Sequence, residues 1–243
     1  MKKYIIKTKC SFCKKIIYRH INNIKDNKFH FCNFPSYCKW AFLHKKKDPK
    51  GYNILKNINN PNFYYLIGLI STDGNIYYHN KNTKSGSYLC CINLNKKDDY
   101  IIKYIQKRFG GWSFYHKTDG TIRWNLSNKL FIEYLRDEVG LTHNKSKTIN
   151  IKEYFNNLSE INKRHFLRGI VDGDGSITSY KAKYGFNNKF TICSGSKQFI
   201  KLFYTFLKNK FKADNIYYEY NKWCDCYYVV CNGKHMINSL DYI

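Results

Sequence analysis

FYYLIGLISTDGNI (63–76) and RHFLRGIVDGDGSI (164–177) align without gaps, although about a hundred residues separate them in this chain. The identical pairs at one constant offset are Leu66 and Leu167, Gly68 and Gly169, Asp73 and Asp174, Gly74 and Gly175, and Ile76 and Ile177. Self-similarity of this kind is the signature of a repeated structural unit. The sequence therefore predicts a tandem of two related half-domains.

The segments that follow each stretch repeat as well. Two strand-like pieces come first, and then apolar helical segments, YIIKYIQKRF (100–109) and FIKLFYTFLKNKF (199–211). A hairpin-like pair closes each half, with the turn Thr118–Gly120 in the first half. Each half therefore reads helix, two strands, helix, two strands and the start of a helix. The predicted class is α/β (α+β), with two pseudo-two-fold related halves.

Small residues four apart lie within the two repeated helices. Gly68 precedes Thr72, and Gly169 precedes Gly173. A mid-helix glycine costs roughly 1 kcal/mol relative to alanine, and small residues at this spacing let two helix backbones approach closely. We expect the two helices to pack side by side about a pseudo-two-fold axis.

This packing would bring Asp73 and Asp174 together at the C-terminal ends of the helices. Helix C-termini carry partial negative charge, so two carboxylates there are unfavourable unless a cation lies between them. Hard oxygen ligands with open positions suit Mg²⁺. A calcium loop starting at Asp172 is excluded, because its Gly and Glu positions are Ile177 and Lys183. An ordinary helix cap would explain one isolated copy of the motif, but two copies favour a metal site.

Charge indicates the class of partner. The chain has 42 Lys and Arg against 17 Asp and Glu, a formal net charge of +25. An AT-rich coding bias would explain part of the lysine content but not the shortage of acids. Nucleic acid is the favoured partner, and a membrane surface is a weaker alternative. The N-terminus lacks an apolar leader and the longest apolar run is too short to span a bilayer, which predicts an intracellular, cytoplasmic protein.

Four of the ten cysteines cluster near the N-terminus in a pattern typical of a zinc site. The candidate ligands are Cys10, Cys13, Cys32 and Cys38. His30 or His44 could replace Cys38, because the second pair is spaced more widely than usual. Reduced cysteines in a small aromatic core are the alternative interpretation. The segments CSFCKK and FHFC resemble the zinc knuckles of mobile-element nucleases, and residues 1–48 are predicted to form this module and its linker.

The segments LIGLISTDG (66–74) and LRGIVDGDG (167–175) resemble the signature of the LAGLIDADG homing endonucleases, in the single-chain form with two motifs. The resemblance implies half-domains at 58–140 and 161–243, joined by a linker at 141–160. Each half would be of αββαββ type, and the antiparallel sheets would form a saddle in the DNA major groove.

The resemblance also implies a monomeric, rare-cutting endonuclease with two or more Mg²⁺ ions and a long asymmetric target, encoded within an intron, an intein or a free-standing mobile gene. By position, Asp73 and Asp174 are the metal-binding acids of the family. The earlier acid of the motif is Asp172 in the second copy but Ser71 in the first. Lys96 lies near the place of a residue that orients the attacking water in the family, although a solvated lysine at the start of a helix is the alternative.

Base readout is expected from alternate residues on the open faces of the strands. In the strand 121–126, Ile122, Trp124 and Leu126 are predicted to point inward and Thr121, Arg123 and Asn125 outward. Arg123 and Asn125 are the best single candidates, since arginine pairs well with guanine and asparagine with adenine. The further candidates are Asn75, Tyr77, His79, Ser176, Thr178, Lys189 and Thr191. A solvated sheet face is the alternative at each position.

Two alternative functions remain for the whole chain: an RNA maturase that binds intron RNA, and a DNA-binding regulator that does not cut.

Overall fold

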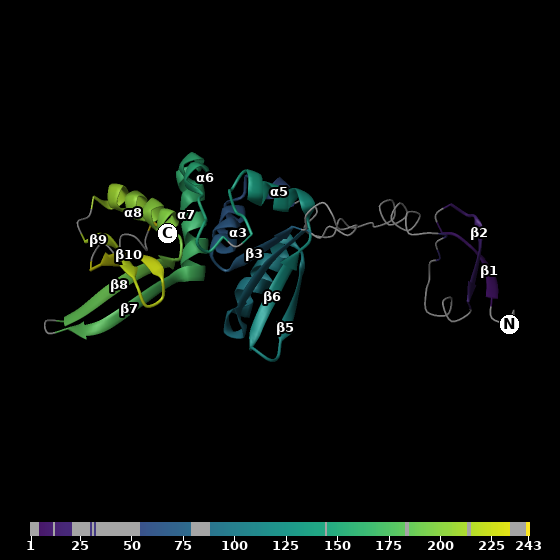
Figure 1. The fold of residues 1–243 in the computed structure, drawn as a ribbon, viewed down its shortest axis with the longest axis horizontal. Coiled ribbons are helices and arrows are strands. Elements are labelled where there is room, and N and C mark those ends of the chain that lie inside the picture. Colours follow the sequence, from purple (N-terminus) through teal and green to yellow (C-terminus); the bar gives the residue numbers. More distant parts are fainter. Residues whose placement is uncertain are drawn as a thin grey trace. The chain divides into compact units, whose positions relative to one another are not determined.

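The computed structural model divides the chain into two compact units, Met1–Asp48 and Pro49–Ile243 (Figure 1). The structure describes residues 5–11, 13–20, 30, 32, 54–78, 88–143, 145–182, 185–212, 215–233 and 242–243. Each unit is described by itself.

The N-terminal unit contains one antiparallel pair of strands. Strand β1 (Ile5–Lys9) pairs with β2 (Ile16–His20), and Lys9 lies opposite Ile16. The turn between them carries Cys10 and Cys13, and Lys14 has a positive φ of 61°. The Cys10 N–H donates to the carbonyl of Lys15 at 2.8 Å, which closes this turn.

The first half of the larger unit has a four-stranded antiparallel sheet in the order β3-β4-β6-β5. Its elements are η1 (Ile54–Asn57), α3 (Pro61–Thr72), β3 (Gly74–Tyr78), β4 (Tyr88–Asn95), η2 (Lys96–Asp98), α4 (Asp99–Phe109), β5 (Trp112–His116), β6 (Thr121–Leu126) and α5 (Lys129–Asp137).

The second half has the same plan, with a sheet in the order β7-β8-β10-β9. Its elements are α6 (Lys152–Asn157), α7 (Glu160–Asp174), β7 (Gly175–Ala182), β8 (Gly185–Ser194), α8 (Lys197–Phe211), β9 (Ile216–Asn221) and β10 (Cys226–Asn232). The register is equivalent too, because Gly74 lies opposite Ile92 and Gly175 opposite Ile192. The predicted tandem repeat of two mixed half-domains with antiparallel sheets is confirmed.

Side-chain caps fix where the helices begin. The side chain of Asn60 accepts from the N–H of Asn62, and Pro61 occupies the first helical position of α3, where its missing N–H is not needed. Ser159 caps α7 and Ser196 caps α8 in the same way. Within the described part of the chain, no helix is both long and apolar enough to cross a bilayer.

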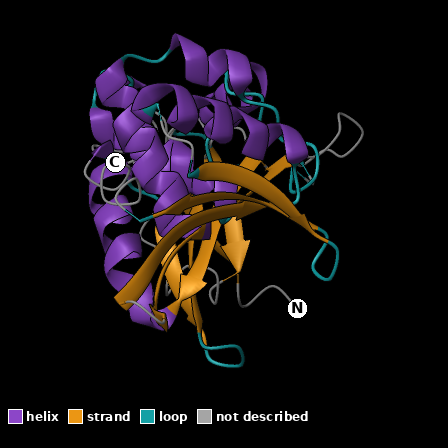
Figure 2. Cartoon of the chain, turned by 90° about the vertical axis from the view of Figure 1, so that its left-hand side faces the viewer, coloured by secondary structure: helices purple, strands orange, loops and turns teal. Residues whose placement is uncertain are grey.

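The sheets bury one face and leave the other open. In the first sheet, Ile92 and Trp124 lie opposite each other and both have 0% exposure. The corresponding pair in the second sheet, Ile192 and Val229, is buried as well. The helices lie on this buried side, and the opposite side of the strands carries no helix (Figure 2).

Helices α3 and α7 join the two halves at the distance of backbone contact. A Cβ added at Gly68 would lie 2.1 Å from the carbonyl oxygen of Phe166, and one at Gly169 would lie 2.1 Å from that of Tyr65. No side chain fits there, so glycine is required on both helices. The close helix packing predicted from the repeated glycines is present, and it determines where the helix ends meet.

Candidate active site and nucleic-acid interface

The two repeated aspartates lie together where α3 and α7 end. Asp73 is the C-terminal cap of α3, and Asp174 is the last residue of α7. A Cβ added at Gly173 would lie 3.2 Å from Oδ2 of Asp73, so the Asp73 carboxylate is beside the residue that precedes Asp174. The contact of α3 with α7 thus brings together two acids that are about a hundred residues apart in sequence.

Both carboxyl groups are harder to ionise than ordinary aspartates. Burial and the neighbouring charge of Asp174 raise the pKa of Asp73 to about 6, although Lys145 opposes the shift. Burial also raises the pKa of Asp174, again opposed by Lys145. Two partly buried acids at helix C-termini form a site that favours a cation.

Lys145 is a site residue that the sequence did not single out. It is 7% exposed, and its Nζ donates to the carbonyl of Ser71 at 2.9 Å and to that of Thr72 at 2.6 Å. These carbonyls lack partners within α3, because they lie in its last turn. Burial lowers the pKa of Lys145, whereas the charges of Asp174 and Asp73 oppose this shift. One ammonium group therefore caps α3 and balances both acids.

The only sequence signal for Lys145 was its place in a basic linker. The stretch HNKSKT (143–148) contains both Lys145 and Lys147. Nothing in the spacing distinguishes the two lysines, yet the side chain of Lys147 is 71% exposed and pairs with Asp225 at 2.5 Å. Only the folded path of the linker buries one of them.

The earlier acid position of the motif is Ser71 in the first copy and Asp172 in the second, and this difference affects packing between the helices. Tyr65 donates its hydroxyl to the Asp172 carboxylate at 2.8 Å, across the contact of α3 with α7. Ser71 is buried and donates to the carbonyl of Ile67 at 2.8 Å, within its own helix. The side-chain hydrogen bonds of Asp172 and Ser71 therefore lie within the helix pair.

Lys96 lies at the start of η2 with an exposed side chain. Its Nζ is 4.7 Å from the centroid of the Tyr115 ring, and its N–H donates to the carbonyl of Gly120 at 3.0 Å. The structure therefore brings Lys145 to the aspartates and places Lys96 beside the β5–β6 turn, and a role of Lys96 in orienting water stays a prediction.

The candidates of the first half lie on the open face of its sheet, but not all of them are accessible. Arg123 is half-buried, and its Nη2 donates to Sγ of Cys91 at 2.9 Å. Asn75 is exposed and donates to the hydroxyl of Tyr77 at 2.9 Å. Asn125 lies on the open side of the sheet, as predicted, but it is only 3% exposed. It lies in the interior strand β6 between Cys91, which is 4% exposed, and Trp112 of the edge strand β5.

The candidates of the second half occupy two rows of the open face of its sheet. Ser176 lies opposite Thr191, and Thr178 lies opposite Lys189. Ser176 and Thr178 are exposed on the edge strand β7. Lys189 is 3.9 Å from the carboxylate of Glu219, which leaves its charge only weakly paired. His79 lies outside the described residues.

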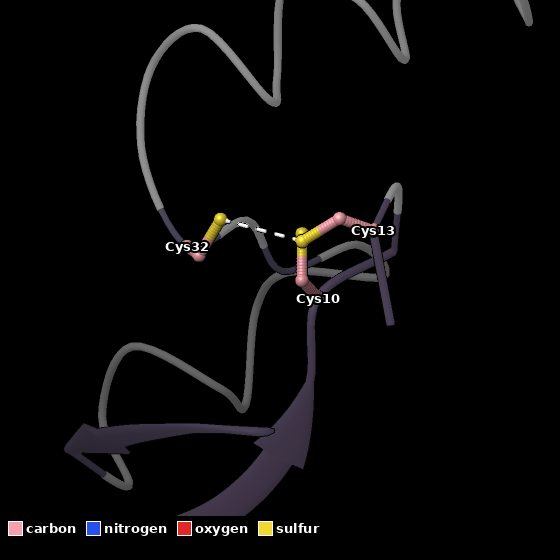
Figure 3. Close-up of side chains that lie close together, drawn as sticks. All are labelled: Cys10, Cys13 and Cys32. Atoms are coloured by element: carbon pink, nitrogen blue, oxygen red, sulfur yellow. Dashed lines mark hydrogen bonds between the residues drawn. The ribbon is translucent and has the colours of Figure 1, made fainter. Parts of the chain in front are cut away.

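Three of the four predicted zinc ligands lie together in the N-terminal unit. The thiols of Cys10, Cys13 and Cys32 are all within 4.8 Å of one another, and Cys13 Sγ is 3.6 Å from Cys32 Sγ (Figure 3). The ring of His30 is not part of this group, although its backbone bonds to Ser11. Cys38 and His44 lie outside the described residues.

Comparison with known proteins agrees with this geometry. Residues 162–243 match the family model of the LAGLIDADG-like domain, and the comparison with curated proteins gives no match. Among solved structures, the LAGLIDADG homing endonuclease I-GzeII in complex with its DNA target is 16% identical, with a TM-score of 0.50 over 74% of this chain and 80% of that one.

Two further solved structures support the same fold. I-LtrWI bound to target DNA is 16% identical, with a TM-score of 0.50 over 76% of this chain and 83% of that one. Mesophilic variants of the homing endonuclease I-DmoI are 14% identical, with a TM-score of 0.55 over 77% and 96%. Residues 162–243 thus match the LAGLIDADG-like domain, and the larger unit has the fold of the LAGLIDADG homing endonucleases.

Proposed function

We propose that this chain is a homing endonuclease that makes a double-strand break at a long asymmetric DNA target by magnesium-dependent hydrolysis. The observation that carries the proposal is the meeting of Asp73 and Asp174 at the ends of α3 and α7. One acid is available for each DNA strand, which is what a break in both strands requires. The fold of the DNA-bound relatives adds support for a double-stranded DNA partner.

The donor set fits magnesium. Asp73 and Asp174 supply carboxylate oxygens from two helix ends, and the raised pKa of Asp73, about 6, reflects burial and the neighbouring charge of Asp174. Mg²⁺ binds through one or two carboxylates and leaves its other positions to water and phosphate. When bound, the metal supplies an activated water and neutralises the leaving oxygen.

The chain's own residues hold and balance this site. Lys145 keeps the last carbonyls of α3 in place and offsets the charge of both acids, so the carboxylates stay close without excessive repulsion. The open sheet faces would bind the duplex, with Arg123 and Asn75 in the first half and Ser176 and Thr178 in the second. The net charge of +25 would supply affinity for phosphate that is independent of base sequence.

The test is magnesium-dependent cleavage of a randomised duplex library by the wild type, Asp73→Asn and Asp174→Asn. Cleavage at one long site by the wild type, lost in both variants while binding survives, is the expected result. Tight, salt-sensitive DNA binding without cleavage by the wild type would sink the nuclease proposal and leave a regulator. Intron splicing by the same preparation would favour the maturase, because that function uses the scaffold and does not depend on the two acids.

We also propose that Cys10, Cys13 and Cys32 bind structural Zn²⁺, with Cys38 as the fourth ligand. Three thiols within 4.8 Å of one another suit tetrahedral zinc. Zinc content measured by mass spectrometry should fall in Cys13→Ser and in Cys38→Ser. The exposed Cys224 of the larger unit provides the matched control, because Cys224→Ser should retain the metal. Full zinc in Cys38→Ser would point to a histidine ligand instead.

The proposal includes a monomer that acts inside the cell, where the DNA of its host element resides. Two complete acidic motifs in one chain support a monomer, because no second copy is needed to supply an acid. Sedimentation of the purified chain at cleavage concentrations tests this part, and a dimer would contradict it.

A further inference from the structure

Trp223 has the most exposed large hydrophobic side chain in the described part of the protein. Its exposure is 99%, whereas Tyr18, the next in order, is 67% exposed. Exposed apolar residues are ordinary on protein surfaces, so exposure alone does not indicate a partner. The inference rests on where Trp223 lies in the sheet and on the hydrogen bonds that hold its turn.

The turn that carries Trp223 lies at the same end of its sheet as Asp174. Gly175 pairs with Ile192, and two residues further along β8, Ser194 pairs with Tyr227 near the start of β10. The turn between β9 and β10 consists of residues 222–225, so it adjoins this end. The Cys193 side chain also joins β8 to this end, because its thiol donates to the carbonyl of Asp174 at 3.7 Å.

The turn is held in one shape by three hydrogen bonds. The N–H of Trp223 donates to Oδ1 of Asn221 at 2.9 Å. Asp225 accepts from the Tyr220 hydroxyl at 2.8 Å and from Nζ of Lys147 at 2.5 Å. Lys147 is two residues from Lys145, so the linker that reaches the aspartates also anchors this turn. An indole presented on a fixed turn loses little conformational entropy when it binds.

The corresponding turn of the first half has the same design without the aromatic. Aligning the equivalent strand pairs matches Lys117 with Lys222, Thr118 with Trp223, and Gly120 with Asp225. Gly120 and Asp225 both have a positive φ, of 66° and 51°. The two turns therefore share a lysine and a backbone shape, and they differ in the side chain that reaches into solvent.

We propose that Trp223 contacts DNA, placing its indole against a base step beside the phosphate that Asp174 serves, with Lys222 on the adjoining backbone. The inference rests on the proposed function. Aromatic side chains stack on any base, and apolar wedges at base steps favour bent DNA. The single carboxylate of the turn, Asp225, is paired with Lys147, so it does not oppose phosphate strongly. Because Thr118 replaces the indole in the first half, the contact falls on one half of the target.

The test combines affinity and fluorescence on mixed-sequence duplex DNA at low ionic strength, without divalent metal. Trp223→Ala should weaken binding about tenfold, in line with the loss of one stacked base. Thr118→Ala, the matched change in the other turn, should leave affinity within about twofold of the wild type, because a short polar side chain forms no stack. Tryptophan emission should fall when the wild type binds, and most of this quenching should be absent in Trp223→Phe. Trp112→Phe should retain it.

The outcomes distinguish the DNA contact of Trp223 from the proposed nuclease function. Equal affinity of wild type and Trp223→Ala, with quenching unchanged in Trp223→Phe, would overturn the role of Trp223 while duplex binding stands. Binding and quenching as expected, without cleavage in magnesium, would remove the nuclease and keep the contact. No salt-dependent duplex binding by the wild type would overturn both. Circular dichroism of each variant guards against misfolding, which is not expected at a residue that is 99% exposed.

Discussion

The two halves of the larger unit share a backbone plan and differ in what surrounds their aspartates. In the first half, α3 is buried from Phe63 to Ser71, and Lys145 caps its end. In the second half, α7 buries fewer positions, and the carbonyl of its last residue, Asp174, accepts from the Cys193 thiol. The repeat thus fixes where the acids lie, whereas residues outside the repeat decide their electrostatics.

The open sheet faces differ in the same way. The strand register matches Arg123 of β6 with Tyr228 of β10, and Asn125 with Val230. A guanidinium and an amide on β6 therefore correspond to a phenol and an apolar side chain on β10. Such differences suit a target whose two half-sites have different sequences.

The largest expected effect tests what the halves share. Gly169→Ala and Gly68→Ala should each lower the free energy of unfolding by at least about 3 kcal/mol, because the added Cβ meets backbone that cannot move aside. Urea denaturation measures the loss. Gly173→Ala, in the same interface, should cost less, because the nearest atoms to its Cβ, Oγ1 of Thr72 at 2.0 Å and Cβ of Thr72 at 2.7 Å, belong to a side chain and not to the backbone. An equal loss in all three variants would contradict this reading of the contact.

The next effect tests the asymmetry around the acids. Lys145→Met should lower the free energy of unfolding by about 2–3 kcal/mol, since it removes two charge-assisted hydrogen bonds from a buried site. DNA cleavage should fall by at least about a hundredfold. Lys147→Met, two residues away and exposed, should cost much less, because its ion pair is screened by solvent. Comparable stability losses at the two lysines would show that burial of Lys145 does not matter.

The open faces predict a smaller, electrostatic difference. Arg123→Ala should weaken DNA binding about tenfold and reduce the salt dependence of binding by about one phosphate contact. Tyr228→Phe, at the matching position of β10 in the second sheet, should leave the salt dependence unchanged because it removes no charge. Titrations of labelled duplex over a series of salt concentrations provide both quantities. An unchanged salt slope in Arg123→Ala would place this guanidinium outside the interface.

The smallest effect concerns proton binding by the acids. The folded pKa of Asp73, about 6, is above its ordinary value of 3.8, so the carboxyl group stabilises the fold while it is protonated. This contribution is complete below about 3.8 and is lost as the pH rises through about 6. Without divalent metal near pH 7, Asp73→Asn should therefore be about 1 kcal/mol more stable than the wild type, after allowance for partial exposure.

Thermal unfolding with and without magnesium checks this effect. The gap between Asp73→Asn and the wild type should close toward about pH 4, where the carboxyl group is protonated in both states. Magnesium should raise the melting temperature of the wild type more than that of the variant, because binding to the folded state adds stability. A gap that widens toward low pH would mean that the pKa of Asp73 is lowered by folding.

The order of the elements could be predicted because it depends on local signals that occur twice. The glycines, the apolar spacing and the terminal Asp-Gly of 63–76 and 164–177 specified two helices, their contact and the meeting of Asp73 with Asp174. Strand alternation in 121–126 placed Arg123 on the open face correctly. It placed Asn125 on the same face, but alternation gives only the side of the sheet and not how closely neighbouring side chains cover a residue, and Asn125 is 3% exposed.

The sequence by itself determined the repeat, the contact of α3 with α7 and the pair of acids, since each rests on residues that are close in the chain or matched between copies. Only the tertiary structure decided which lysine balances those acids. Lys145, Lys147 and Lys96 are alike as sequence, but one is buried on helix carbonyls, one pairs with Asp225, and one lies over Tyr115. The physical reason is that burial and charge pairing depend on the path of the linker through the folded unit, which no local pattern encodes.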